Sequence, residues 1–445
     1  MKYSVFLLLI SCTAFSQGHS KDNEVKKYVS QVSEDSLKSY ISKLVSFETR
    51  HTLSTIDDPK QGIGAARNWV VKKFNDYAKN SGGRMEVYLQ QEDLQPDGKR
   101  IDQAVNLGNA VAFLKGTDPN DKRIFLIGGH LDSRVTDVMN RTSKAPGAND
   151  DGSGVSAVIE SARILSGSSF PASIIFVAFS GEEQSLLGSK QLAEKMKREN
   201  LQLEAVLNND MIGNPKAGET GEVNTRILRV FSEGLPYKDL DKKAMVIRNL
   251  GFENDSESRQ LARYIKEITE EYIKGLEIKL IYRNDRFLRG GDHTSFVNNG
   301  FPSVRLTEYY ENYDHQHQDI RVENNKQYGD LPEFIDFKYL KKNVAANIAV
   351  LVNLAKSTSK PEKVEMDVKE LTNSATLHWE KPKSGIPAGY YVLARETDSP
   401  VWQKRIFTTG LSIKVPLSKD NYIFAVQTIS QSGNLNVPVI PGIAK

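Results

Sequence analysis

An unbroken apolar run ends abruptly beside two adjacent acidic residues. Residues 173–179, SIIFVAF, carry no charged side chain, and only Ser180 and Gly181 separate them from Glu182 and Glu183. A strand that is apolar throughout must be buried on both faces, which is typical of the central strands of parallel sheets. Adjacent like charges repel each other, and a plain strand-to-helix turn does not require both. The run therefore predicts a central strand whose end carries chemistry.

Six more strand-like runs alternate with helical patterns between residues 60 and 357. The runs cover residues 84–90, 109–116, 123–130, 205–213, 226–232 and 302–308. The helical patterns cover residues 153–166, 184–198, 256–275 and 338–356. Such alternation predicts an α/β domain with a mixed, mostly parallel central sheet that is flanked by helices. Residues 18–50 and 61–80 predict further helices before the sheet.

The two ends of the chain differ from this α/β region. Residues 1–16 combine Lys2, an apolar core and small residues, which predicts a signal peptide and a secreted or periplasmic protein. A lipoprotein anchor on Cys12 is a less favoured alternative. No other apolar run is long enough to span a membrane. Residues 355–363 are polar and predict a linker, and residues 358–445 alternate with period two, which predicts a small all-β sandwich.

Composition narrows the possible chemistry. The net charge of the 445 residues is only +3, without a basic stripe, so we expect no nucleic-acid partner. Cys12 is the only cysteine, and loss of the signal peptide would leave no thiolate and no disulfide. The serine-hydrolase elbow, the HExxH metalloprotease motif and the nucleotide-binding glycine motifs are absent. A metal site would therefore consist of histidine and carboxylate ligands.

Residues that can bind metal gather where the predicted strands end. They are His130, Asp132, Asp150, Asp151, Glu182, Glu183, Asp210, His315, His317 and Asp319. Singly, each is more often a turn, cap or surface residue. Together they would meet at one sheet edge, because the carboxyl ends of parallel strands lie side by side. Nitrogen and oxygen ligands suit zinc, and a carboxylate can bridge two ions about 3.5–4 Å apart.

The ordered motifs of residues 60–357 resemble a known enzyme family. These motifs are His130-Leu-Asp132, the segment 146–154 (PGANDDGSG), Glu182-Glu183, Asp210-Met211 and His315-x-x-x-Asp319. They resemble the secreted co-catalytic di-zinc aminopeptidases, which include bacterial leucyl-type enzymes and the aminopeptidase Y group. The resemblance implies the zinc exopeptidase fold and two zinc ions per chain.

The resemblance also implies a set of metal ligands. Asp150 would bridge both ions, with His130 and Asp210 on one ion and Glu183 and His315 on the other. His317 is the alternative to His315, and the family spacing to Asp319 favours His315. The Asp150-Asp151 bond matches the position of a non-proline cis peptide in the family.

The remaining roles follow from the same resemblance. Glu182 would be the general base, and Asp132 would orient His130. Asp319 is a candidate to orient the later histidine ligand. Asp292 and His293 are candidates for the substrate site, although a helix-start cap is an equally good interpretation of this pair.

These roles predict an aminopeptidase whose substrates are peptide or protein N-termini. The closest alternative is a glutaminyl-peptide cyclotransferase of the same fold, for which the resemblance implies one zinc; His130 favours the peptidase. A carboxypeptidase or dipeptidase is the next alternative, and the absence of a large lid insertion counts against it. A catalytically dead binding protein is a further alternative, which complete ligands and an intact Glu182 argue against.

Residues 358–445 resemble a fibronectin type III module. Trp379 would be its core tryptophan and Tyr422 its corner tyrosine. We expect such a module to dock substrate or another surface, because it carries no cluster of catalytic residues.

Overall fold

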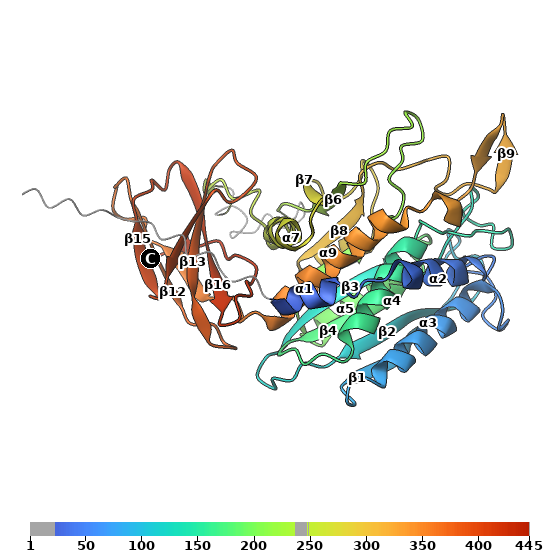
Figure 1. The fold of residues 1–445 in the computed structure, drawn as a ribbon, viewed down its shortest axis with the longest axis horizontal. Coiled ribbons are helices and arrows are strands. Elements are labelled where there is room, and N and C mark those ends of the chain that lie inside the picture. The colour runs from blue at the N-terminus through green and yellow to red at the C-terminus, as the bar shows by residue number, and fades with distance from the viewer. Residues whose placement is uncertain (1–22, 236–246, 248, 445) are drawn as a thin grey trace, which may run out of the picture.

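The computed structural model describes residues 23–235, 247 and 249–444 (Figure 1). The predicted signal peptide of residues 1–16, with Cys12, lies outside the described residues. The centre of the chain is an eight-stranded sheet with strand order β1-β2-β4-β3-β5-β8-β6-β7. No helix within the described residues is both long enough and apolar enough to cross a membrane.

The sheet is parallel at its centre and mixed toward its edges. Its strands are β1 (Met85–Leu94), β2 (Val105–Leu114), β3 (Arg123–His130), β4 (Ser173–Phe179), β5 (Gln202–Asn209), β6 (Ile227–Ser232), β7 (Glu277–Ile281) and β8 (Ser303–Glu308). Strands β4, β3, β5 and β8 run parallel to one another, while β2 and β6 pair antiparallel with β4 and β8. Strand β4 is buried at every position, as its apolar run predicts. The predicted fold class is confirmed.

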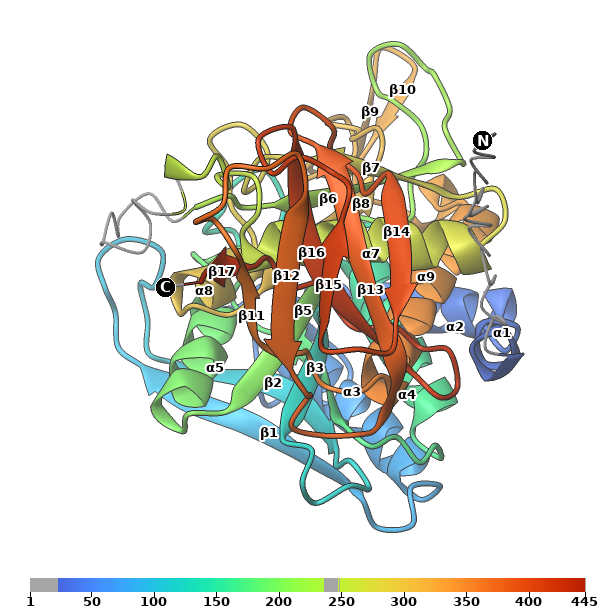
Figure 2. The ribbon, with the colours of Figure 1, turned by 90° about the vertical axis from the view of Figure 1, so that its left-hand side faces the viewer.

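Helices cover both faces of this sheet (Figures 1 and 2). They are α1 (Asn23–Val29), α2 (Glu34–Val45), α3 (Gly62–Ala78), α4 (Gly152–Leu165), α5 (Leu187–Arg198), α7 (Glu257–Tyr272), α8 (Asp292–Asn298) and α9 (Phe337–Lys356). Alternate strand residues point to opposite faces. Phe125 and Phe176 therefore join the core formed with α3, α4, α7 and α9, whereas Val177 and Phe179 pack with α5 and α8.

Two small sheets follow α9. One contains β15 (Ser412–Val415), β12 (Ala375–Glu380), β11 (Glu362–Met366) and β17 (Gly442–Ile443). The other contains β14 (Lys404–Thr408), β13 (Pro387–Glu396) and β16 (Tyr422–Ser430). Trp379 of one sheet packs on Tyr390 of the other, with ring centroids 5.2 Å apart. The sheets thus face each other across a shared apolar core, and the identification as a fibronectin type III module stays a prediction.

The segment of residues 357–361, within the predicted linker of residues 355–363, connects α9 to β11 and is packed against the central sheet. Ser357, Thr358 and Ser359 are buried. The guanidinium of Arg123, at the start of β3, donates hydrogen bonds to the carbonyls of Ser357 (2.6 Å) and Thr358 (3.0 Å). The hydroxyl of Ser357 accepts a further bond of 3.1 Å from the same guanidinium, the hydroxyl of Thr358 donates to that of Thr428 (2.8 Å), and the hydroxyl of Ser359 accepts a bond from the N–H of Ser384 (3.0 Å). Polar side chains can be buried here because each has a hydrogen-bond partner.

A buried ion cluster fastens the C-terminal sheets to the rest of the chain. Asp255, which precedes α7, lies 3.0 Å from Arg263 of α7 and 2.6 Å from Arg395 of β13. All three side chains are almost completely buried. Removal of one partner from such a cluster leaves buried charge without compensation.

We therefore expect Asp255→Ala to destabilise the whole chain. Two buried guanidinium groups would lose their counter-charge, and the free energy of unfolding should fall by about 3–5 kcal/mol. Urea unfolding followed by tryptophan fluorescence would measure this change. Asp420→Ala makes the same replacement at an exposed loop position and should leave the midpoint unchanged. Equal midpoints for the two variants would contradict the prediction.

Candidate metal centre

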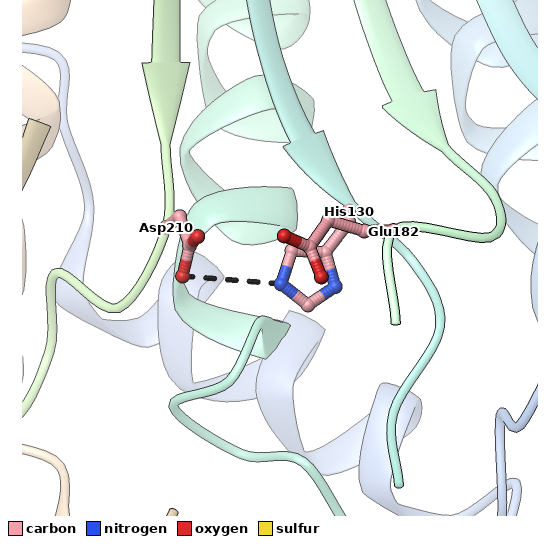
Figure 3. A group of neighbouring side chains, drawn as sticks. All are labelled: His130, Glu182 and Asp210. Carbon is pink, nitrogen blue, oxygen red and sulfur yellow. Dashed lines mark ion pairs between the residues drawn. The ribbon is translucent and has the colours of Figure 1, made fainter. Parts of the chain in front are cut away.

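The four central parallel strands bring the predicted residues to one edge of the sheet. His130 is the last residue of β3, and Asp210 follows β5 directly. Glu182 follows β4 after a turn at Gly181, whose φ of 77° lies in the left-handed region. Figure 3 shows the side chains of these three residues turned toward one another from three neighbouring strand ends.

These three residues form the first of two groups that could hold a metal ion. The nearest ligand atoms of His130, Glu182 and Asp210 all lie within 4.8 Å of one another. The Nε2 atom of His130 is 3.9 Å from Oδ1 of Asp210. We call this set the His130 group.

The second group contains Asp150, Glu183 and His317. Their ligand atoms also lie within 4.8 Å of one another. The Nε2 atom of His317 is 2.9 Å from Oδ2 of Asp150 and 2.8 Å from Oε1 of Glu183. The other oxygen of Asp150 lies 3.0 Å from Nε2 of His130. Asp150 therefore lies between His130 and His317, with one oxygen toward each histidine, and links the second group to the first.

The structure brings His317, and not His315, to this centre. The ring of His315 stacks on Phe334 with centroids 3.6 Å apart. The backbone N–H groups of His315 and Gln316 both donate to the carbonyl of Asn312, which makes a tight turn. His317 follows with φ of 56°, in the left-handed region. This turn directs the second histidine inward, and the expected placement of His315 is corrected accordingly.

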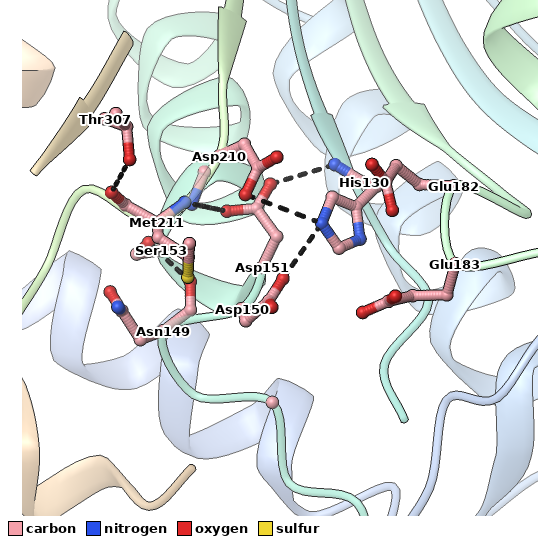
Figure 4. Close-up of polar contacts among 12 residues, drawn as sticks. His130, Asn149, Asp150, Asp151, Ser153, Glu182, Glu183, Asp210, Met211 and Thr307 are labelled. Atoms are coloured by element: carbon pink, nitrogen blue, oxygen red, sulfur yellow. Dashed lines mark hydrogen bonds and ion pairs between the residues drawn. The ribbon is translucent and has the colours of Figure 1, made fainter. Parts of the chain in front are cut away.

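Asp151 ties three parts of the site together (Figure 4). Its carboxylate accepts hydrogen bonds from the backbone N–H groups of His130 (2.9 Å), Gly154 (2.9 Å) and Met211 (3.1 Å). It thereby caps α4 and joins that helix to the ends of β3 and β5. The Asp150-Asp151 peptide bond is cis, as the resemblance implies.

Asp132 contacts both His130 and the paired glutamates. Its backbone carbonyl lies 3.0 Å from Nδ1 of His130, closer than its carboxylate at 3.8 Å. The carboxylate accepts hydrogen bonds from the N–H groups of Glu182 (3.2 Å) and Glu183 (3.0 Å). The hydroxyl of Thr52 donates a further bond of 2.9 Å. Asp132 thus fixes the turn that presents the glutamates as well as the histidine ring.

The carboxylates and histidines of the site influence one another's charge. Burial lowers the pKa of His317, but the charges of Glu183 and Asp150 outweigh burial and raise it to about 9. Burial and the nearby Glu183 and Asp210 raise the pKa of Glu182 well above its usual value, although His130 opposes this shift. So much negative charge in a buried place favours a bound cation.

The predicted residues outside the two groups differ in burial: Asp292 and His293 are buried, and Asp319 is partly exposed. Asp292, the first residue of α8, is buried, and its carboxylate lies near the hydroxyl of Ser189. Burial raises its pKa to about 7. His293 is buried beside it and contacts the carbonyl of Asn284 through Nε2 at 2.8 Å. The N–H of Asp319 donates to the Thr136 hydroxyl at 3.3 Å, and no hydrogen bond or ion pair joins Asp319 to either histidine among the described residues.

The pattern of strand ends did not point to several charged partners of the site. Arg305 of β8 lies 3.1 Å from Asp210 and 2.7 Å from Asp285, and all three are buried. Asp330 accepts hydrogen bonds from the backbone N–H groups of Asn149 and Asp150. Arg305 is the only charged residue in the strand-like run PSVRLT, and a lone charge in such a run could have indicated a buried ion pair. Asp330 lies in a loop whose sequence has no pattern that could have predicted its role.

The donor set fits a pair of zinc ions. Each group offers one imidazole nitrogen and two carboxylates, and Asp150 can reach both groups. The Oε1 atom of Glu183 is buried, and the Nε2 atom of His317 lies 2.8 Å from it. Nitrogen and oxygen ligands at these positions are what zinc sites use in the absence of cysteine.

The centre opens into a cavity of about 320 Å³. The lining residues from the two groups are His130, Asp150, Glu182, Glu183, Asp210 and His317. The remainder of the wall consists of Arg100, Arg134, Ser185, Leu186, Arg286, Arg289, Gly290 and Gln316. A cavity of this size holds a small ligand or the end of a peptide.

Solved structures with this fold include peptidases. The LapA aminopeptidase of Legionella pneumophila superimposes with a TM-score of 0.54 and 18% identity, over 80% of this chain and 78% of that chain. The glutaminyl cyclase of Porphyromonas gingivalis superimposes with a TM-score of 0.51 and 19% identity, over 72% and 98% of the two chains. At such low identity these likenesses establish the fold alone.

Sequence relatives extend the comparison over nearly the whole chain. A probable zinc metalloprotease of Leptosphaeria maculans is 41% identical over 421 residues, which cover 94% of this chain and 97% of the relative. A probable zinc metalloprotease of Pyrenophora tritici-repentis is 40% identical, over 94% and 87% of the two chains. The model of the family described as Peptidase family M28 matches residues 109–335. From this match and these relatives it follows that the chain belongs to Peptidase family M28.

Proposed function

We propose that this chain is a secreted, zinc-dependent aminopeptidase that removes N-terminal residues from peptides. One observation carries the proposal. Two three-residue groups meet where four parallel strands end, and Asp150 of the second group also reaches His130 of the first. Membership of a peptidase family, relatives named as zinc metalloproteases and an aminopeptidase of the same fold support it. The predicted signal peptide supports secretion.

Five residues would hold two zinc ions in this proposal: Asp150 on both, His130 and Asp210 on one, and Glu183 and His317 on the other. When bound, the ions would activate a water molecule and polarise the scissile carbonyl. Asp132 and Asp151 hold the ligands in place through the hydrogen bonds described above. Arg305 balances the charge of Asp210 from beneath the site.

Glu182 is the proton carrier in this scheme. It faces the cavity, and its side chain forms no hydrogen bond or ion pair within the described part of the chain. Its raised pKa suits a group that takes a proton from the attacking water and gives it to the leaving amine. The charge of the buried Asp292 also raises this pKa.

The His130 group favours this peptidase over a glutaminyl-peptide cyclotransferase. A single zinc on Asp150, Glu183 and His317 would leave the His130 group without a metal role. The fold alone does not separate the two activities, since both occur among the structural neighbours.

Two experiments test the proposed activity: removal of the metal, and a comparison of substrates with a free N-terminal amine and with a blocked one. The purified mature chain should release fluorophore from aminoacyl coumarin amides, lose this activity after chelation, and regain it with zinc. N-acetylated versions of the same substrates should resist cleavage, because an aminopeptidase requires a free amine. Full activity after verified metal removal would contradict the zinc requirement. Cyclisation of glutaminyl peptides without release of an amino acid would identify a cyclase instead.

Glu182→Gln separates the general base from the ligands. The amide cannot accept the proton, so turnover should fall by about 10²- to 10⁴-fold. Zinc content, measured by inductively coupled plasma mass spectrometry, should stay at about two ions per chain. Glu199→Gln, an identical change at an exposed residue of the same region, should alter neither quantity. Loss of zinc from Glu182→Gln would reverse the roles of the two glutamates.

A matched pair of histidine variants tests the second group. His317→Ala removes the imidazole beside Asp150 and Glu183, and should reduce zinc content to about one ion per chain and abolish activity. His315→Ala removes a ring that stacks on Phe334 and should keep both ions. The reverse pattern, with zinc lost only from His315→Ala, would restore the spacing-based assignment.

A further inference from the structure

Four arginines line the cavity beside the candidate metal centre: Arg100, Arg134, Arg286 and Arg289. They come from three different loops. Arg100 lies between β1 and β2, Arg134 follows β3, and the other two lie between β7 and α8. Convergence of separate loops on one cavity makes this arrangement a property of the site rather than of one basic segment.

Two of these arginines are already paired with carboxylates. Arg134 lies 2.9 Å from Oε2 of Glu183. Arg286 is mostly buried and lies 3.0 Å from Glu311 and 3.3 Å from Asp285. These two side chains are engaged in the wall of the cavity, so their guanidinium donors are not free to turn toward a ligand.

The other two have no acidic partner among the described residues. Arg100 is exposed and donates one hydrogen bond, from Nη1 to the carbonyl of Glu183 at 2.7 Å. Arg289 is exposed, and no hydrogen bond or ion pair of its side chain occurs within the described part of the chain. A guanidinium presents a planar fork of donors that suits a carboxylate, and these forks are free to bind one.

The remaining wall gives little support for an apolar substrate. Leu186 is the only hydrophobic side chain among the residues that line the cavity in the described structure. A pocket for a leucine-like or aromatic side chain would need several such residues. The carboxylates of the wall, in contrast, all belong to the two metal groups. Once bound cations neutralise these carboxylates, the arginines determine the charge of the cavity wall that a ligand contacts.

We propose that this cavity selects peptides that carry a carboxylate close to the cleaved bond, bound by Arg100 and Arg289. The proposal rests on the proposed peptidase function and names its substrate class. The carboxylate can belong to the side chain of an N-terminal aspartate or glutamate, or to the C-terminus of a dipeptide. Both sources present the same group to the same forks.

Pairs of charged and neutral isosteres test this selectivity. The first arm compares glutamyl and glutaminyl coumarin amides, which differ only in the side-chain carboxylate and have no C-terminal one. The second arm compares alanyl-alanine with alanyl-alanine amide. We expect kcat/KM to be at least about 10-fold higher for the charged member of one pair, since hydrogen bonds to charged groups are the stronger ones. The arm that shows the preference identifies the source.

Variants connect the preference to the named residues. Arg100→Ala and Arg289→Ala should each reduce the charged-to-neutral ratio, and the double variant should bring it close to one. Arg283→Ala is the matched control, because Arg283 is exposed in the same loop as Arg289 but lies over the ring of Phe287 and does not line the cavity. It should keep the full ratio.

A binding measurement separates this proposal from the proposed function. Isothermal titration of the zinc-loaded chain with free glutamate and free glutamine compares ligands with identical amino and α-carboxyl groups. Glutamate should bind at least about 10-fold more tightly if the first arm holds. If no substrate is cleaved, the peptidase proposal fails, and weaker glutamate binding in the double variant would still support the arginine site. The proposed arginine site would be overturned by equal kcat/KM within both substrate pairs, or by a charged-to-neutral preference that is unchanged in the double variant.

Discussion

The candidate site depends on one buried carboxylate that belongs to neither metal group. Asp151 accepts backbone hydrogen bonds from the end of β3, the start of α4 and the residue after Asp210. Gly154 is required for this approach, because a Cβ atom there would lie 2.3 Å from Oδ2 of Asp151. Three segments that are far apart in the sequence thus share one acceptor. Small shifts of this group would move His130, Asp150 and Asp210 together.

A buried ion-pair network lies next to the site. Arg305 lies in β8, in the interior of the sheet, and joins Asp210 to Asp285. Burial would raise the pKa of Asp210, but Arg305 and His130 together outweigh burial and keep that pKa below its usual value. Asp210 therefore stays ionised, which is the form that binds a metal. A buried ion pair contributes little to stability by itself, so the role of Arg305 in this proposal is to keep the proposed ligand Asp210 ionised.

The strand ends could be predicted from sequence because their physical cause is simple. Apolar runs predict buried parallel strands, and parallel strands align their carboxyl ends, so His130, Glu182 and Asp210 had to meet. The choice between His315 and His317 could not be made this way. Both lie in an irregular turn without periodicity, and the backbone angles of that turn decide which ring points inward. The arginines of the cavity wall escaped prediction for the same reason, since their loops have no repeat that places them.

The C-terminal sheets contact the start of the loop that carries two of these arginines. Tyr282, at the start of that loop, donates a hydrogen bond of 2.7 Å to the carbonyl of Pro400, between β13 and β14. The same carbonyl accepts a bond of 2.8 Å from Arg263 of α7. Leu393 and Leu435 continue the core of the central sheet, so the two parts share one apolar interior. An alignment of 421 residues with the Leptosphaeria relative must extend into these sheets. The sheets thus hold Tyr282, the residue from which the chain runs on to Arg286 and Arg289 in the cavity wall.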